Sequence, residues 1–138
     1  MKKFLVLLLV FSAAACRAES PESPAMLDVS DCSDISASAQ VDDCLHKEKL
    51  NSQTVLDEGM GQFEAYIRDL YQADPGLGGQ LIETVTEAQR AWVVFRNANC
   101  KGEAFEAEEG TLLQQSLINS CVARMNAERT EYLGQLLR

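Results

Sequence analysis

The sequence predicts an all-α protein: a small antiparallel bundle of three to four helices, stapled by two disulfides. Three observations favour this fold. Beyond residue 31, apolar residues recur largely at steps of three and four, which is the repeat of one helix face. Hardly any stretch has the apolar–polar alternation of a strand. Four of the five cysteines fall in this helical region, which suits two cross-links.

The chain opens with the pattern of a secretory signal peptide. Two lysines precede an apolar run over residues 4–11, and small residues follow up to Cys16. The apolar run is too short to span a bilayer and lies where a signal peptide has its apolar core. We expect export with removal of residues 1–15, or of residues 1–18 if a second small-residue site is cut.

Cys16 is a candidate lipidation site. The three alanines before it resemble a bacterial lipobox, although alanine stands where leucine or valine is usual. Five cysteines leave one over in an exported chain, and lipidation of Cys16 would leave an even number. Such a lipid would be the chain's only expected membrane contact. Residues 16–30 would then form a flexible tether to a helical domain at residues 31–138.

Two helices are expected before residue 71. The first covers residues 36–50. Its inner face is expected to hold Val41, Cys44 and Leu45. The second covers residues 51–70 and has a clearer apolar stripe, which consists of Leu56, Met60, Phe63, Ile67 and Leu70. Gly59 and Gly61 each cost about 1 kcal/mol relative to alanine in a helix, so they predict a weak point or a close contact there.

Two longer helices are expected after the turn signal Ala-Asp-Pro-Gly at residues 73–76. The first of them starts near residue 77 or 79 and ends near Cys100. Its apolar stripe consists of Leu81, Val85, Ala88, Trp92 and Phe95. A polar, glutamate-rich connection at residues 101–110 then leads into the last helix, at residues 111–137. The expected inner face of that helix consists of Leu113, Leu117, Cys121, Met125, Tyr132 and Leu136.

Four cysteines can pair in three ways, and the sequence does not decide among them. Short separations favour Cys32 with Cys44, and Cys100 with Cys121, because each pair brackets one loop and the end of a helix. A zinc site is the weaker alternative. The chain has no Cys-x-x-Cys pair and its only histidine is His46, and an exported chain meets an oxidising compartment.

The charge of the chain bears on its partners. The formal net charge is −9, and loss of the two N-terminal lysines with a signal peptide makes the mature chain more acidic still. A nucleic-acid partner is not expected, because such binding needs a basic surface. Acidity permits electrostatic steering toward a basic protein, and it also keeps a small domain soluble.

No catalytic constellation accompanies the helical pattern. His46 lies on a polar helix face without a partner that would position it as a general base. Four glutamates, at positions 103, 106, 108 and 109, lack the spacing of a calcium loop. There is no nucleophile elbow and no glycine-rich phosphate loop. We therefore expect no enzyme, no cofactor and no metal.

The segment Gln89-Arg90-Ala91-Trp92, followed by Arg96 and Cys100, resembles the LprI-like lysozyme-inhibitor family of exported bacterial proteins. Further likenesses fall along the rest of the chain: Asp43-Cys44-Leu45, Leu50-Asn51, Ser120-Cys121 and Arg129-Thr130. The resemblance implies a disulfide-stapled helical domain in the periplasm or cell envelope. For the family's namesake it implies inhibition of lysozyme.

The resemblance makes five residues candidates for the core or for binding: Gln89, Arg90, Trp92, Arg96 and Arg129. Trp92 lies on the apolar stripe, which favours a core role. Arg90 and Arg96 fall off that stripe. They are expected either to contact a partner or to clamp acidic side chains within the domain, for which the candidates are Glu83, Glu87 and Glu128.

Two functional hypotheses follow from the resemblance and the acidity. In the first, the protein binds a lysozyme-type muramidase and covers its cleft without catalysis. The exposed candidates for the contact are residues 101–110 and residues 74–79. In the second, it is a structural or adaptor envelope protein that binds another protein partner. The sequence does not specify an oligomeric state.

Overall fold

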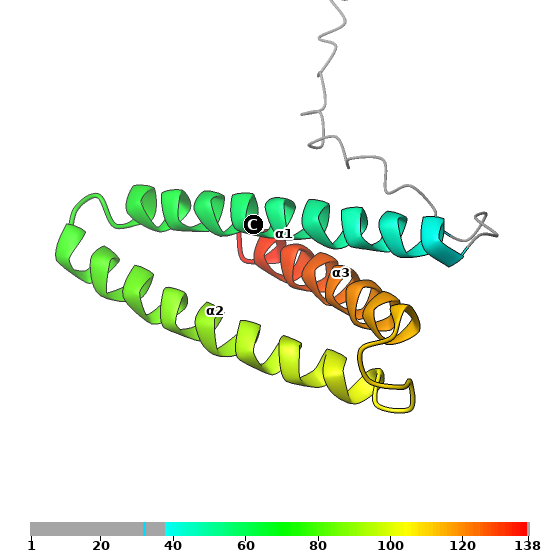
Figure 1. Cartoon of the computed structure of the whole chain (residues 1–138). Coiled ribbons are helices and arrows are strands. Elements are labelled where there is room, and N and C mark those ends of the chain that lie inside the picture. Colours follow the sequence, from blue (N-terminus) through cyan, green and yellow to red (C-terminus); the bar gives the residue numbers. More distant parts are fainter. Residues whose placement is uncertain (1–31, 33–37, 138) are drawn as a thin grey trace, which may run out of the picture.

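The computed structural model describes Cys32 and residues 38–137, and this part of the chain consists of three helices without a strand. The helices are α1 (Ser38–Leu70), α2 (Pro75–Glu103) and α3 (Leu112–Gln135). Figure 1 shows α1 and α2 diverging from the turn that joins them, with α3 lying between the two in this view. Among the three helices, α1 and α3 make the most extensive contact with each other. The prediction of a small antiparallel helical bundle is confirmed.

The predicted signal peptide, the lipidation of Cys16 and the tether at residues 16–30 lie outside the described residues, so they stay predictions. None of the helices described is long and apolar enough to cross a membrane.

The two helices expected before residue 71 are one helix, α1, so the four-helix version of the prediction is wrong. Residues 49–53 interrupt the apolar stripe because polar side chains face the other helices here. Lys49 Nζ donates to Asn119 Oδ1 of α3 at 3.0 Å, and Ser52 Oγ accepts from Asn126 Nδ2 at 3.0 Å. The inner face of α1 therefore continues through polar residues, and nothing in this stretch ends the helix.

The main apolar core lies along the second half of α1. Four of the five residues predicted for this stripe are buried: Leu56, Met60, Phe63 and Ile67. Leu133 of α3 completes the cluster. Leu70 is instead 60% exposed, because it is the last residue of α1. Gly59 faces Thr130 closely enough that an added Cβ would lie 3.6 Å from its methyl group, whereas Gly61 faces open space.

Local capping sets where α2 and α3 begin. Asp74 Oδ1 accepts a hydrogen bond from the backbone of Leu77 at 3.1 Å, and Pro75 occupies the first turn, so α2 starts slightly earlier than predicted. Thr111 Oγ1 accepts from the backbone of Gln114 at 3.2 Å and caps α3. Gly110 precedes this cap with a φ of 79°, a left-handed conformation that glycine adopts without strain.

The predicted inner faces of α2 and α3 are partly wrong. On α2, Phe95 is 58% exposed and Ala88 is exposed, while Gln89 and Arg96 point inward. On α3, four residues predicted to be inside are exposed: Leu113, Leu117, Tyr132 and Leu136. The buried residues of α3 include Asn119 and Asn126. The other predicted residues of these faces do pack in the core: Leu81, Val85, Trp92, Cys121 and Met125. Because polar residues occupy neighbouring core positions, the apolar pattern alone gives only part of each inner face.

Both favoured disulfides are present. The sulfur atoms of Cys32 and Cys44 are 2.01 Å apart, and those of Cys100 and Cys121 are 2.07 Å apart. The second bond joins the last turns of α2 to α3 and is buried in a cluster with Val122. A cross-link that closes a loop of this size contributes about 3 kcal/mol to stability.

Candidate functional site

Arg96 lies at the centre of the three helices and is 6% exposed. Its Nη1 donates to Asn126 Oδ1 of α3 at 2.5 Å and to Gln53 Oε1 of α1 at 2.8 Å. Its Nε and Nη2 both donate to Asn97 Oδ1, at 3.1 and 3.0 Å. One guanidinium group therefore joins α1, α2 and α3.

The buried charge of Arg96 has amide oxygens as hydrogen-bond partners and, among the described residues, no carboxylate in direct contact. Burial lowers the pKa of Arg96, and the nearby charge of Asp57 acts in the opposite direction. An arginine side chain nevertheless stays protonated in proteins. The group therefore meets its hydrogen-bonding needs mostly through amide oxygens, which hold its geometry without supplying a full opposite charge.

Trp92 stacks against two arginines next to this point. The Arg96 Cζ atom lies 5.4 Å from the Trp92 ring centroid, and the Arg129 Cζ atom lies 5.6 Å from it. Arg129 also lies over Tyr132, at 5.1 Å, and its Nε donates to Gln89 Oε1 at 3.0 Å. Such cation–π contacts each contribute about 0.5 to 2 kcal/mol, more where the groups are shielded from water.

We call these residues the arginine–tryptophan layer: Gln89, Trp92, Arg96, Asn126 and Arg129. It brings together four of the five residues singled out by the sequence motif. Of the two roles expected for Arg96, the structure has the clamp within the domain, but its acceptors are amides instead of Glu83, Glu87 or Glu128. The fifth motif residue, Arg90, is exposed on the outer side of α2.

The acceptors of Arg96 on the other two helices, Asn126 and Gln53, were not predicted from the sequence. Asn119, Val122, Asn126 and Leu133 share the buried face of α3 at steps of three, four and seven. This repeat of mixed polar and apolar residues is the signal that could have revealed Asn126. Gln53 has no comparable signal, because it lies where the stripe of α1 is interrupted by polar side chains.

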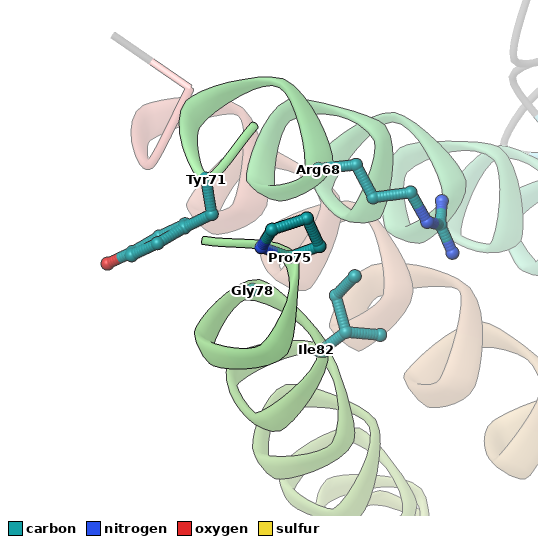
Figure 2. Close-up of a pocket in the computed structure, with 6 residues that line it drawn as sticks. Arg68, Tyr71, Pro75, Gly78 and Ile82 are labelled. Carbon is teal, nitrogen blue, oxygen red and sulfur yellow. The ribbon is translucent and has the colours of Figure 1, made fainter. Parts of the chain in front are cut away.

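A shallow hollow of about 360 Å³ lies at the start of α2, beside the turn that joins it to α1. Figure 2 shows Arg68 and Tyr71 of this hollow extending in opposite directions, with Pro75 and Ile82 between them. Arg68 is engaged by Glu64 at 3.0 Å. The lining has no carboxylate, thiol or imidazole, so it holds no group suited to acid–base or nucleophilic chemistry.

Residues 103–117 form the opposite end of the molecule, which we call the α2–α3 end. Phe105 is 84% exposed and Leu113 is 62% exposed, and Leu112 and Leu117, in the first turns of α3, are exposed as well. Glu106, Glu108 and Glu109 are exposed in the connecting loop. Within the described residues, no group of three histidine, cysteine or acidic side chains is placed to hold a metal ion, and His46 is exposed.

The sequence model of the lysozyme inhibitor LprI family matches residues 30–133. The chain belongs to the LprI family. An uncharacterised protein of Rhizobium meliloti strain 1021 is 29% identical over 130 residues, which cover 94% of this chain and 90% of that protein. The crystal structure of a DUF1311 family protein from Pseudomonas putida KT2440 is similar with a TM-score of 0.65. It is 28% identical, and the match covers 71% of this chain and 91% of that one.

Membership of the LprI family confirms the resemblance first seen at Gln89 to Cys100. The structure gives these residues a specific setting in this member. Three of the motif side chains contact α1 or α3: Arg96 is buried, and Gln89 and Trp92 are half-buried. The surface available to a partner therefore consists mostly of other residues.

Proposed function

We propose that this LprI-family protein is exported to the periplasm or cell envelope, where it binds a lysozyme-type muramidase and blocks its cleft without catalysis. The observation that carries the proposal is the family match over residues 30–133. A lipid on Cys16 would hold the domain at the membrane surface, where it would meet a muramidase that attacks the wall.

The charge of the chain supports the same proposal. Many lysozymes are strongly basic, and a net charge of −9 attracts a basic partner and raises the rate of encounter. The cleft of a lysozyme works with two carboxyl groups, and a bound protein that excludes substrate from it inhibits without any chemistry of its own.

A rigid shape supports tight binding, because little conformational freedom is lost when the complex forms. The two disulfides and the arginine–tryptophan layer hold the helices in one arrangement. A binding surface on this frame is formed before the partner arrives.

The experiment is a titration of lysozyme turnover of cell-wall substrate with the mature oxidised protein. We expect dose-dependent inhibition, and we expect it to disappear after reduction of the disulfides. Absence of inhibition by a folded, oxidised sample against several lysozyme types would contradict the proposal.

An adaptor role for another protein partner is the second candidate, favoured by the exposed apolar side chains of the α2–α3 end. Salt dependence separates the two. A sterically blocking acidic inhibitor loses association rate as salt rises, whereas an adaptor held by apolar burial does not.

A further inference from the structure

The most exposed large apolar side chain of the described residues lies at the α2–α3 end. Phe105 is the most exposed of the large apolar residues described, and Leu112, Leu113 and Leu117 follow it within 12 positions of the chain. Leu113 and Leu117 are four residues apart on α3, so they share one face of that helix. An aromatic ring with neighbouring leucines is the composition of an interface centre.

The same end is acidic and holds no basic residue. From Gly102 to Ala123 the sequence has four glutamates and no lysine, arginine or histidine. Glu103 is engaged by Arg124 at 2.9 Å. Glu106, Glu108 and Glu109 form no ion pair with any residue that the structure describes. Their charges are therefore available to a partner.

The loop that carries Phe105 is held in place by its own contacts. Phe105 donates its backbone hydrogen bond to Gly102 at 3.2 Å, and the neighbouring Ala104 is 1% exposed. Thr111 donates to the backbone of Glu108, and the Cys100 disulfide fixes the two helices just behind the loop. Phe105 is thus presented on a structured connection, which reduces the entropy lost on binding.

From these observations we infer that the α2–α3 end is the surface that docks onto the muramidase, an inference that rests on the proposed function. Its partner surface has an apolar depression for Phe105 and Leu113, bordered by lysine or arginine side chains that pair with Glu106, Glu108 and Glu109. A basic protein fits this description.

Two other binding partners for the α2–α3 end would be repelled by its glutamates. A second copy of the chain docked through the same end would place the unpaired glutamates of both copies together, and like charges at an interface cost several kcal/mol. An anionic lipid surface would repel the same carboxylates, since such surfaces attract basic segments.

The test measures binding of the mature oxidised protein to a basic egg-white lysozyme by surface plasmon resonance. We expect Phe105→Ser to weaken binding about ten-fold or more, with an unchanged thermal midpoint. The matched control is Leu70→Ser, which removes a 60% exposed apolar side chain at the opposite end of α1 and is expected to leave binding unchanged.

A second variant tests the charges and does not depend on the aromatic ring. Replacing Glu106, Glu108 and Glu109 together by glutamine is expected to lower the association rate several-fold at low salt and to flatten its salt dependence. The dissociation rate should change less, because these side chains lie around the apolar contact and not within it.

The outcomes distinguish this inference from the proposed function. If the wild-type protein binds and inhibits, while both variants do so equally well, the docking surface is wrong and the proposed function stands. If Leu70→Ser weakens binding and Phe105→Ser does not, the other end of the molecule docks. If the wild-type protein binds no lysozyme, the proposed function fails and this surface fails with it.

Discussion

The arginine–tryptophan layer and the α2–α3 end use their polar groups in opposite ways. Within the layer, the guanidinium groups of Arg96 and Arg129 donate to side-chain oxygens of the same chain. At the α2–α3 end, Glu106, Glu108 and Glu109 pair with no described residue and Phe105 stays in solvent. The motif residues of this layer thus hold the helices together, and the surface that we propose for a partner is made of common residue types.

The largest expected effect is on stability, from loss of the layer's central side chain. Arg96→Ala leaves the side-chain oxygens of Gln53 and Asn126 without their donor and opens a cavity, so we expect a loss of about 4 kcal/mol in the free energy of unfolding. Urea denaturation measures it. Arg90→Ala is the matched control on the same helix, and we expect a change within about 0.5 kcal/mol. Equal losses of stability from the two substitutions would contradict the claim that Arg96 supports the fold and Arg90 does not.

The next largest effect is expected from loss of a disulfide, which changes stability and, chiefly for one of the two bonds, lysozyme binding. Replacing Cys100 and Cys121 together by alanine is expected to cost about 3 kcal/mol. Because this bond lies directly behind the α2–α3 end, we also expect weaker lysozyme binding by the folded variant. The matching replacement of Cys32 and Cys44 removes a bond near Asp42, which accepts from Ser116 Oγ at 3.1 Å. It should also lower stability but should weaken binding less, because this bond does not join α2 to α3 on the two sides of Phe105. Thermal unfolding and binding at a temperature where both variants are folded would show the difference.

A third region, the α1–α2 turn, is closely packed like the arginine–tryptophan layer, so we expect a substitution there to lower stability. A Cβ added at Gly78 would lie 2.9 Å from the Cβ of Tyr71, so Gly78→Ala should cost about 2 kcal/mol. Gly79→Ala places the same methyl group in open space within α2, and should stabilise the protein by about 0.5 to 1 kcal/mol. Chemical denaturation of the two variants gives the sign of each change. If both substitutions lowered the free energy of unfolding, the cost at Gly78 would reflect the backbone freedom of glycine in this turn and not its close contact with Tyr71.

The smallest effect is expected from the one ion pair that joins α2 to α3 on the surface. Hydrogen bonds from Arg124 to Glu103 and Glu128 raise the pKa of Arg124, yet all three side chains are about half exposed to solvent or more. Glu103→Gln should therefore change stability by less than about 1 kcal/mol. A larger loss in urea denaturation would show that the α2–α3 end depends on its charges for structure and is not free to use them for binding.

Local signals in the sequence predicted much of the fold. The Asp74-Pro75 turn and the apolar stripe of α1 depend on neighbouring residues only, and the structure confirms both. Short separations along the chain favoured the two disulfides without deciding among the three pairings, and the structure has both bonds. Family membership could be predicted as well, because the Gln89 to Cys100 motif is visible without a structure.

The inner faces of α2 and α3 could be predicted only in part. An apolar pattern assigns Phe95 to the interior and Arg96 to the surface, whereas the hydrogen bonds of Arg96 to Gln53 and Asn126 reverse this assignment. The partners of Arg96 Nη1 on α1 and α3 are 43 and 30 residues away in the chain. A buried polar group needs hydrogen-bond partners, and a single sequence does not reveal partners as distant as these.

Hydrogen–deuterium exchange of the mature protein, with and without a bound lysozyme, tests the central claim most directly. Backbone amides at residues 103–117 should gain protection in the complex. Those at residues 68–79, and those around Arg90 on the outer face of α2, should exchange at the same rate in both samples. Protection confined to either of these two regions would contradict the separation of a structural layer from a binding end.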